Sequence, residues 1–306
     1  MNYYIDHNQD KARPYEHALK RAGHHETNIQ SADFCLVDHN WSDGLRNETA
    51  LLDYCWETKK PVFMIPHGFR GYLFWDAVYE ISHKLSGVFV PSIGQKEILE
   101  KGGFPVPIHI TGYPWCKVKP FSSSKLEKVL FAPMHPDWDG TYKYSAYAFA
   151  WNVQAFQKLI NIEDKIQLTI YHQFEPIQNG LWLHPNVKYV PSDLNISNAL
   201  KMIEEADLVI ANDTFASLAI ASGKSTVMFD DSFYDHIEGR PSKFFEHYHI
   251  YPYNILWEED TLRLFNDVIQ SHPKVELWKY HYIGNNFNED AFLYFINQSL
   301  RVRTND

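Results

Sequence analysis

The sequence predicts an α/β protein with two Rossmann-like domains, each built on a parallel sheet, that face one another across a cleft. Short apolar runs alternate with amphipathic segments along most of the chain, a pattern typical of βαβ units. Residues 206–231 contain the clearest such unit. Residues 111–128, with several Pro, Gly, Ser and Lys, separate two series of these units and have the composition of a hinge. We therefore expect an N-terminal domain at residues 1–116 and a C-terminal domain at residues 117–306.

The expected strands of the N-terminal domain are short apolar runs, and its expected helices carry apolar side chains three and four residues apart. The strands are at residues 2–5, 34–37, 62–65, 87–90 and 108–110, and the helices are at 11–22, 48–56 and 95–101. Pro66, His67 and Gly68 follow one of these strands. His67 is therefore expected just past the carboxyl end of a strand, where α/β proteins bind their ligands.

The C-terminal domain repeats this pattern. Strands are expected at residues 129–132, 168–171, 187–190, 208–210 and 226–229, with helices through Phe149, Val153, Phe156 and Ile160, at 196–203, and after 212–214. His135 and His172 each follow a strand. Beyond Asp231 the pattern weakens into an aromatic, His-rich segment, and a last helix at 288–300 could pack back on the N-terminal domain.

The central unit carries the most informative turn. Its strand at 208–210 runs into Asn-Asp-Thr at 212–214, which are N-cap residue types. The helix that follows has one apolar face and ends at Gly223. Its N-terminus is expected at the carboxyl edge of the sheet, where backbone N–H groups bind phosphate.

The same unit contains a motif that imitates a different phosphate site. Residues 223–226, Gly-Lys-Ser-Thr, match the end of a Walker A loop. That loop requires a glycine five residues before Gly223, where Leu218 stands, and it runs from strand to helix rather than from helix to strand. We expect these residues to be an ordinary turn.

Composition excludes several classes of protein. The net charge of −10 gives no general attraction for duplex nucleic acid. The three cysteines are far apart and form no CxxC pair, so neither a disulfide framework nor a zinc site is expected. The N-terminus lacks the pattern of a signal peptide, and no window approaches the roughly 18 apolar residues of a transmembrane helix. We expect a cytoplasmic protein without a transmembrane segment.

Residues 87–114 (GVFVPSIGQKEILEKGGFPVPIHITGYP) and the central unit, in this order and spacing, resemble the GT-B superfamily. The closest branch holds the CDP-glycerol glycerophosphotransferases and the capsule and teichoic-acid glycosyltransferases, and the UDP-N-acetylglucosamine epimerases are more distant. The resemblance covers residues 60–235. It implies a GT-B fold and a nucleotide-activated sugar or CDP-polyol as co-substrate, held mainly by the C-terminal domain. It implies no cofactor and no obligatory metal.

The resemblance also suggests roles for residues. His67 matches a His-Gly pair that places a candidate catalytic base, although Pro66 stands where a Trp is common. Asp213 and Thr214, with Ser217, match the Asp-Ser-Ser or Asp-Ser-Gly motif that binds donor phosphates, and the bulky Phe215 replaces a small residue there.

Two histidines are further candidates for donor binding. His135, followed by proline, is similar to the His-Pro motif of bacterial sialyltransferases, which contacts the nucleotide phosphate. With His172 it ends a strand and could stabilise a leaving phosphate. No Asp-x-Asp pair follows a strand at the place where metal-dependent glycosyltransferase folds have one, and the spacing of His236, His247 and His249 does not favour a metal site. Asp76, Asp137 and Asp139 are alternative bases.

These residues favour an enzyme that transfers a sugar, or a polyol phosphate, from a nucleotide to an acceptor hydroxyl. Two alternatives stay open: an epimerase-like enzyme acting on a nucleotide sugar, and a catalytically silent nucleotide-sugar-binding module. The acceptor could be a glycan, a small molecule, a lipid-linked polymer or, less readily for an acidic protein, a modified nucleic acid.

Overall fold

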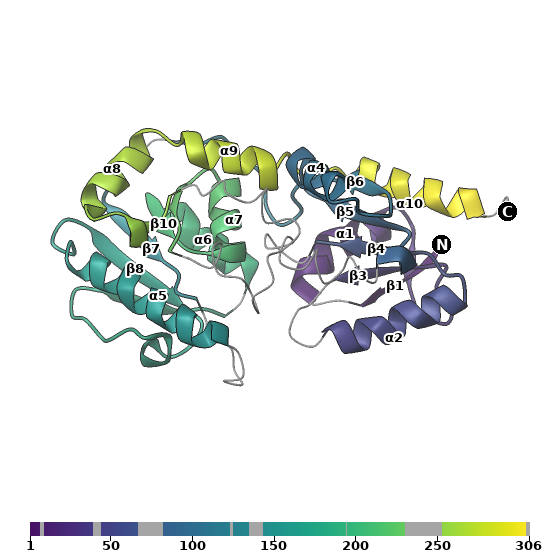
Figure 1. Cartoon of the computed structure of the whole chain (residues 1–306), viewed down its shortest axis with the longest axis horizontal. Helices are drawn as coiled ribbons and strands as arrows, with labels where there is room; N and C mark the ends of the chain where they lie inside the picture. Colours follow the sequence, from purple (N-terminus) through teal and green to yellow (C-terminus); the bar gives the residue numbers. More distant parts are fainter. Residues whose placement is uncertain are drawn as a thin grey trace. The chain divides into compact units, whose positions relative to one another are not determined.

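The computed structural model describes residues 1–6, 9–38, 44–66, 82–122, 125–134, 143–193, 195–229 and 253–303. The chain forms two compact units (Figure 1). Among the described residues, unit 1 holds 1–117 and 280–303, and unit 2 holds 118–229 and 253–279. The last residues of the chain thus belong to the same unit as the first.

Unit 1 contains a six-stranded parallel sheet in the order β2-β1-β3-β4-β5-β6. Its strands are β1 (Asn2–Asp6), β2 (His25–Glu26), β3 (Phe34–Asp38), β4 (Val62–Ile65), β5 (Gly87–Val90) and β6 (Ile108–Ile110). Its helices are α1 (Gln9–Arg21), α2 (Gly44–Glu57), the 3-10 helix η1 (Ser82–Lys84), α4 (Ile93–Lys101) and α10 (Glu289–Arg303). The sequence did not suggest β2, which has only two residues.

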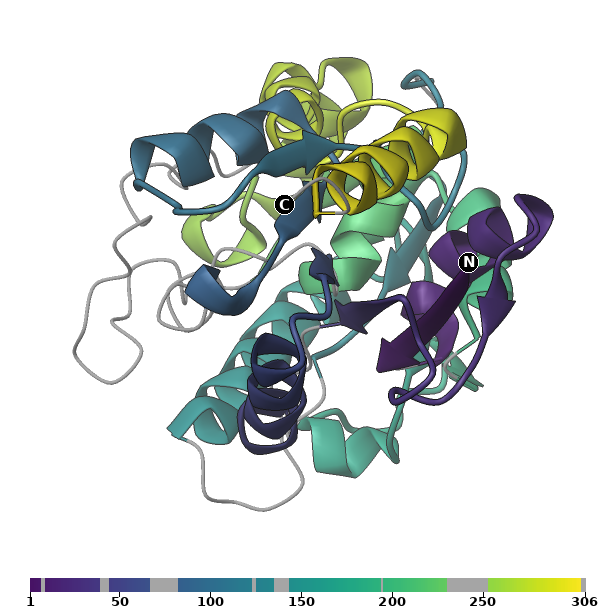
Figure 2. The ribbon, with the colours of Figure 1, turned by 90° about the vertical axis from the view of Figure 1, so that its right-hand side faces the viewer.

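Helices cover both faces of this sheet. Alternate strand residues, among them Phe34, Phe63 and Phe89, point toward α1 and α10, where Tyr15 and Phe292 complete the core. Figure 2 looks at unit 1 with α10 in yellow on one side of the sheet and α2 in dark blue on the other. Parallel strands buried on both faces have no polar side, which explains their continuous apolar runs.

Two backbone hydrogen bonds join the segment before α10 to the residues that follow β6. The Tyr113 backbone N–H donates to the Asn285 carbonyl at 2.8 Å, and the Asn288 N–H donates to the Thr111 carbonyl at 2.7 Å. Between them Gly112 has a φ of +82°, and a Cβ atom there would lie 2.1 Å from the Asn286 carbonyl oxygen. Glycine is therefore required at 112 by both conformation and space.

Unit 2 contains a five-stranded parallel sheet in the order β11-β10-β7-β8-β9. Its strands are β7 (Lys128–Phe131), β8 (Gln167–His172), β9 (Lys188–Pro191), β10 (Leu208–Ile210) and β11 (Ser225–Val227). Its α-helices are α5 (Lys143–Ile160), α6 (Ile196–Glu205), α7 (Asp213–Ala221), α8 (Thr261–Gln270) and α9 (Pro273–Tyr282), the last of which extends into unit 1, and its 3-10 helices are η2 (Pro176–Asn179) and η5 (Ile255–Trp257).

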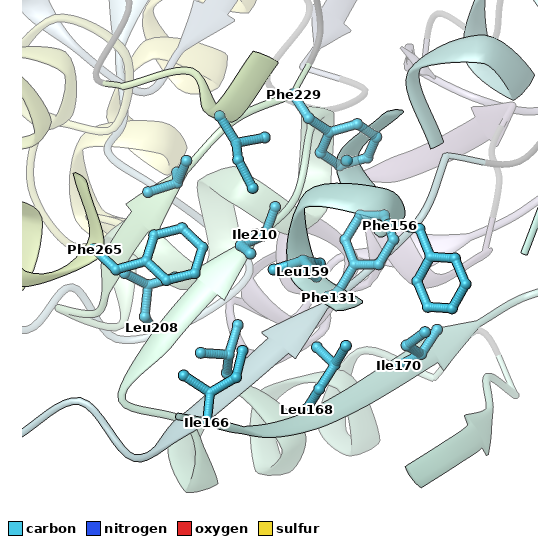
Figure 3. Packing of buried hydrophobic residues seen from close by; sticks show 14 of the residues in the cluster. Phe131, Phe156, Leu159, Ile166, Leu168, Ile170, Leu208, Ile210, Phe229 and Phe265 are labelled. Carbon is cyan, nitrogen blue, oxygen red and sulfur yellow. The ribbon is translucent and has the colours of Figure 1, made fainter. Parts of the chain in front are cut away.

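The core of unit 2 lies between this sheet and the helices α5 and α8 (Figure 3). Phe131 of β7 packs edge-on against Phe229, with ring centroids 5.1 Å apart, and Phe156 of α5 joins the same cluster. One expectation was wrong: Phe149 is 44% exposed rather than buried. Helix α5 buries Trp151, Ala155, Phe156 and Leu159, so its apolar face is rotated away from Phe149.

Membrane-spanning helices were not expected. No helix in the described part of the chain is long and apolar enough to cross a membrane.

Candidate anion-binding site

The strand order of unit 2 identifies a candidate ligand site. The chain builds β7, β8 and β9 outward in one direction, and then returns to place β10 on the other side of β7. The carboxyl ends of β7 and β10 therefore flank the point where the direction of winding reverses, and open α/β sheets bind ligands there. The register pairs Ile210 with Phe131, so both strands end at the same level.

Helix α7 begins directly after β10 and turns its N-terminus toward this edge. Asn212 occupies the N-cap position with extended backbone angles, but its side chain makes no capping hydrogen bond. The positive end of the helix dipole and the N–H groups of the first turn are thus left for another partner. Helix N-termini are common positions for bound anions in proteins, which makes this helix start a candidate site.

Only one of the two polar atoms of the Asn212 side chain has a hydrogen-bond partner among the described residues. Its Oδ1 accepts a hydrogen bond at 3.0 Å from the backbone N–H of Phe229, which follows β11. Its Nδ2 is buried and has no hydrogen-bond partner in the part of the chain that the structure describes. Asn212 is 4% exposed, so bulk water does not satisfy this amide either. Buried donors are normally satisfied, and a ligand acceptor would satisfy this one.

The expected hydroxyl residues occupy different environments. Thr214 lies partly exposed in the first turn of α7. Ser217 is fully buried, and its hydroxyl donates to the Thr214 carbonyl at 2.8 Å. The Ser217 proton is therefore engaged within the helix. Asp213 is the first residue of α7, and its side chain lies outside the described part of the structure.

Two aromatic rings are in contact beside the start of α7. The ring of Phe215 lies 5.6 Å from that of Tyr171 at the end of β8, with 42° between the planes. Phe215 stands where the resembled motif has a small residue. The contact with Tyr171 gives this large side chain a packing role.

His172 ends β8 at the same edge of the sheet and is 9% exposed. Its Nδ1 lies 2.6 Å from the carbonyl oxygen of Phe174, which also accepts from Asn179 Nδ2 at 3.1 Å. A carbonyl only accepts, so we assign the proton to Nδ1, which leaves Nε2 with a lone pair in the neutral ring. His172 can donate from Nε2 only after gaining a second proton.

A second buried asparagine positions the loop after β7. Asn152 of α5 is fully buried; its Oδ1 accepts from the Met134 N–H at 2.9 Å, and its Nδ2 donates to the Met134 carbonyl at 2.7 Å. These two bonds fix the residue directly before His135. The sequence alone did not indicate that Asn152 would hold the Met134 backbone. Its only signal was a polar residue between the apolar residues Trp151 and Val153 of α5.

Several expected site residues lie outside the described residues. They are His67 and His135, and the alternative bases Asp76, Asp137 and Asp139. His236, His247 and His249, which were not expected to bind a metal, also lie outside the described residues. Within the described ranges no group of three or more His, Cys, Asp or Glu side chains could hold a metal ion.

The motif that imitates a Walker A loop is a turn, as expected. Lys224 Nζ donates to the carbonyls of Glu204 at 2.8 Å and Ala206 at 2.7 Å, at the C-terminal end of α6. Burial lowers the pKa of this ammonium group. Gly223 has a φ of +76°, and a Cβ atom there would lie 2.2 Å from the Pro120 carbonyl oxygen. Gly223 and Lys224 precede β11, and Ser225 and Thr226 are its first two residues, so the motif lies at the amino edge of the sheet, away from the N-terminus of α7.

Comparisons with known proteins support the fold. No family model matches the chain, and no curated protein matches it in sequence. A histidine-to-asparagine variant of the wall teichoic acid polymerase TagF superposes with a TM-score of 0.57 at 11% identity, over 100% of this chain and 90% of that one. A histidine-to-alanine variant of TagF gives 0.53 at 11% identity, over 99% and 89%. Sucrose-phosphate synthase from Thermosynechococcus elongatus gives 0.49 at 10% identity, over 99% and 98%.

The likeness to TagF extends over the whole chain and concerns the fold. Together with the two parallel sheets, it confirms the expected GT-B architecture of two Rossmann-like domains.

Proposed function

We propose that this protein is a glycosyltransferase-like enzyme that moves a sugar, or a polyol phosphate, from a nucleotide-activated donor to an acceptor hydroxyl. The observation that carries the proposal is the start of α7, where an uncapped first turn and the unpaired Nδ2 of Asn212 stand at the switch point of a parallel sheet. A nucleotide diphosphate is the anion that suits this position in a GT-B fold.

In this proposal the donor phosphates accept hydrogen bonds from the first-turn N–H groups, including that of Asp213, and from the Thr214 hydroxyl. Ser217 acts through its bond to the Thr214 carbonyl, which fixes the turn. In sugar transfer, the bond between donor carbon and phosphate oxygen breaks and negative charge develops on the leaving nucleoside diphosphate. In polyol phosphate transfer, the bond between the two phosphates breaks instead and the charge develops on the leaving nucleoside monophosphate. Preorganised N–H groups stabilise that charge most effectively in a site that excludes water.

His135 and His172 are proposed to add donor contacts from the neighbouring loops. His172 would do so in its doubly protonated form, because its Nδ1 proton is already bound to the Phe174 carbonyl. Unchanged donor affinity in a His172→Ala variant that folds normally would remove His172 from the site. We propose no cofactor and no divalent metal.

His67 is proposed as the base that takes the proton of the acceptor hydroxyl while the new bond forms. A positioned base contributes about a hundred- to ten-thousand-fold to such a step. The change His67→Asn should lower turnover by about that factor and leave donor affinity nearly unchanged, which steady-state kinetics and titration would measure together. Unchanged turnover would move the search to Asp76, Asp137 and Asp139.

The decisive test is nucleotide binding at α7. Asn212→Asp keeps the Oδ1 acceptor for the Phe229 N–H and replaces the unpaired Nδ2 with a negatively charged oxygen. We expect the affinity for nucleoside diphosphates and nucleotide sugars, measured by isothermal titration with EDTA present, to fall by about a hundredfold, which is about 2.7 kcal/mol.

Asn161→Asp is the matched control. Asn161 is an exposed residue of unit 2, and the new carboxylate can still accept the Gln157 hydrogen bond, so the same charge is added elsewhere in the unit. Equal affinities for the two variants would show that α7's start does not bind the donor. Binding that depends on Asn212 without any turnover would favour the silent binding module.

A further inference from the structure

Two of the three cysteines, distant in sequence, meet in the core of unit 1. Cys35 is the second residue of β3 and Cys55 lies in the last turn of α2. Both are fully buried, and their sulfur atoms are 3.6 Å apart, within hydrogen-bond distance for thiols. Cys116 is partly exposed and lies far along the chain from both.

The backbone around this pair is held in place. The N–H of Lys60, just beyond α2, donates to the Cys55 carbonyl at 2.8 Å, and the Cys35 N–H donates to the Pro61 carbonyl at 2.9 Å. Two consecutive residues thus connect the end of α2 to the start of β3. A disulfide needs the sulfur atoms to approach to about 2.05 Å, a change that side-chain rotation can supply when the backbones are already adjacent.

The surroundings favour the thiolate form of Cys55. Lys60 Nζ donates to the carbonyls of Gln30 at 3.0 Å and Ala32 at 2.5 Å, which keeps its charge near the pair. The hydrogen bond from Cys35, and secondarily the charge of Lys60, outweigh burial and lower the pKa of the Cys55 thiol. The thiolate is the reactive form of cysteine, so Cys55 is the nucleophile of the pair.

We propose that Cys35 and Cys55 form a redox-sensitive site that a hydroperoxide converts to a disulfide. The Cys55 thiolate attacks the peroxide O–O bond, which gives a sulfenic acid and, with hydrogen peroxide, one molecule of water. The Cys35 thiol then attacks the Cys55 sulfur and displaces the second water. Two thiols lose two electrons and two protons, and one peroxide becomes two water molecules.

The position of the pair predicts what the bond leaves unchanged. In the sheet, Cys35 lies opposite Val62, the first residue of β4. The two cysteines therefore lie at the amino end of the unit 1 strands. The α7 start is part of unit 2. Nucleotide affinity should therefore be the same in the reduced and oxidised protein, and the redox inference does not depend on the proposed function.

The test treats the reduced, folded full-length protein with a small excess of hydrogen peroxide, removes the peroxide, and then blocks the free thiols with iodoacetamide in denaturant, which exposes all three cysteines. We expect two of the three thiols to be lost, a mass decrease of about 2 Da before alkylation, and a proteolytic peptide pair linking Cys35 to Cys55. Cys116→Ser should react in the same way as the wild type. Cys35→Ser should leave a Cys55 sulfenic acid that dimedone traps.

The wild-type experiment decides the question even if a serine variant fails to fold. Three alkylated thiols after peroxide treatment, or a bridge that includes Cys116, would overturn the inference, and the pair would then be two thiols packed as small apolar groups. A bridge that forms only in denaturant would also overturn it. Since the bond closes a loop of the unfolded chain, the oxidised protein should melt several degrees higher, and a lower melting temperature would contradict the geometry.

Discussion

Buried asparagines define the local geometry of the candidate site at the residue scale. Asn152 holds the Met134 backbone with both polar atoms of its amide. Asn212 bonds Phe229 with Oδ1, and its Nδ2 has no partner among the residues that the structure describes. A fully bonded amide rigidifies a loop, and an unpaired donor costs free energy unless something binds it. The contrast between these two residues is what separates a structural asparagine from a candidate ligand contact.

Lys224 provides a residue-scale prediction. If it only holds the end of α6, Lys224→Met should remove two charge-assisted hydrogen bonds and lower the free energy of unfolding by about 2 kcal/mol. Urea denaturation would measure this free energy. The control is Lys201→Met, at an exposed residue of α6, and its free energy of unfolding should change by less than about 0.5 kcal/mol. Nucleotide affinity should be the same in both variants. A selective loss of nucleotide binding in Lys224→Met would revive the phosphate-loop interpretation.

At the scale of elements, the buried strands were the most predictable. The strands expected at 62–65, 87–90, 108–110 and 208–210 have those bounds in the structure. Their side chains are buried on both faces, so each strand is an uninterrupted apolar run between turn residues. The helix start after β10 was predicted for a similar reason, because N-cap residue types follow such a run.

The elements that the sequence did not suggest have identifiable causes. Helix α8 carried a usable signal: Asp260 accepts from the Arg263 N–H at 3.0 Å, and Leu264, Phe265 and Val268 are buried. The aromatic, His-rich residues before it obscured that pattern. Helix α9 mixes aromatic and charged residues all round, so its apolar period is weak. The pairing of Cys35 with Cys55, and of Asn152 with Met134, depends on tertiary packing that sequence spacing cannot show.

The site was predicted in part. Sequence reasoning found the helix start at 213–214, but it treated Asn212 as a cap, whereas its side chain bonds Phe229 instead. An asparagine side chain before a helix can either cap that helix or hydrogen-bond to a neighbouring strand segment. The choice depends on where β11 lies, which the sequence does not show. Ser217 matched the motif by spacing, yet a hydroxyl buried inside the helix bonds its own backbone.

At the scale of the whole molecule, three histidines of unit 1 are withdrawn from water to different degrees: His24 is buried, and His109 and His281 are half-buried. His24 lies with its ring 6.2 Å from Phe34, and His109 stacks on Phe295 of α10 at 4.1 Å. The Nε2 of His109 is buried without a hydrogen-bond partner among the described residues. His281 packs against Gly94 of α4: a Cβ atom added to Gly94 would lie 2.6 Å from the Cα atom of His281. Burial lowers the pKa of all three imidazoles, because it disfavours the charged ring.

These pKa shifts predict acid sensitivity. A histidine whose pKa is lower in the folded than in the unfolded protein stabilises the fold fully above the unfolded value of 6.5. As the pH falls through that value toward the folded pKa, the unfolded chain takes up protons that the folded chain does not, and stability is lost. We therefore expect the urea midpoint to fall between about pH 7.5 and pH 5, beyond what the fold loses from its carboxylates.

His109→Phe separates this effect from general acid denaturation. The variant keeps an aromatic ring against Phe295 but cannot bind a proton, so its urea midpoint should depend less on pH than that of the wild type, whatever its absolute stability. The exposed His25→Gln variant, in the same unit, is the control for removing a histidine from the unfolded chain. Hydrogen exchange followed by mass spectrometry should show the acid-induced loss of protection at β6 and α10, where His109 and Phe295 meet. An identical pH dependence of the midpoint in wild type and His109→Phe would show that burial of His109 does not link folding to protonation.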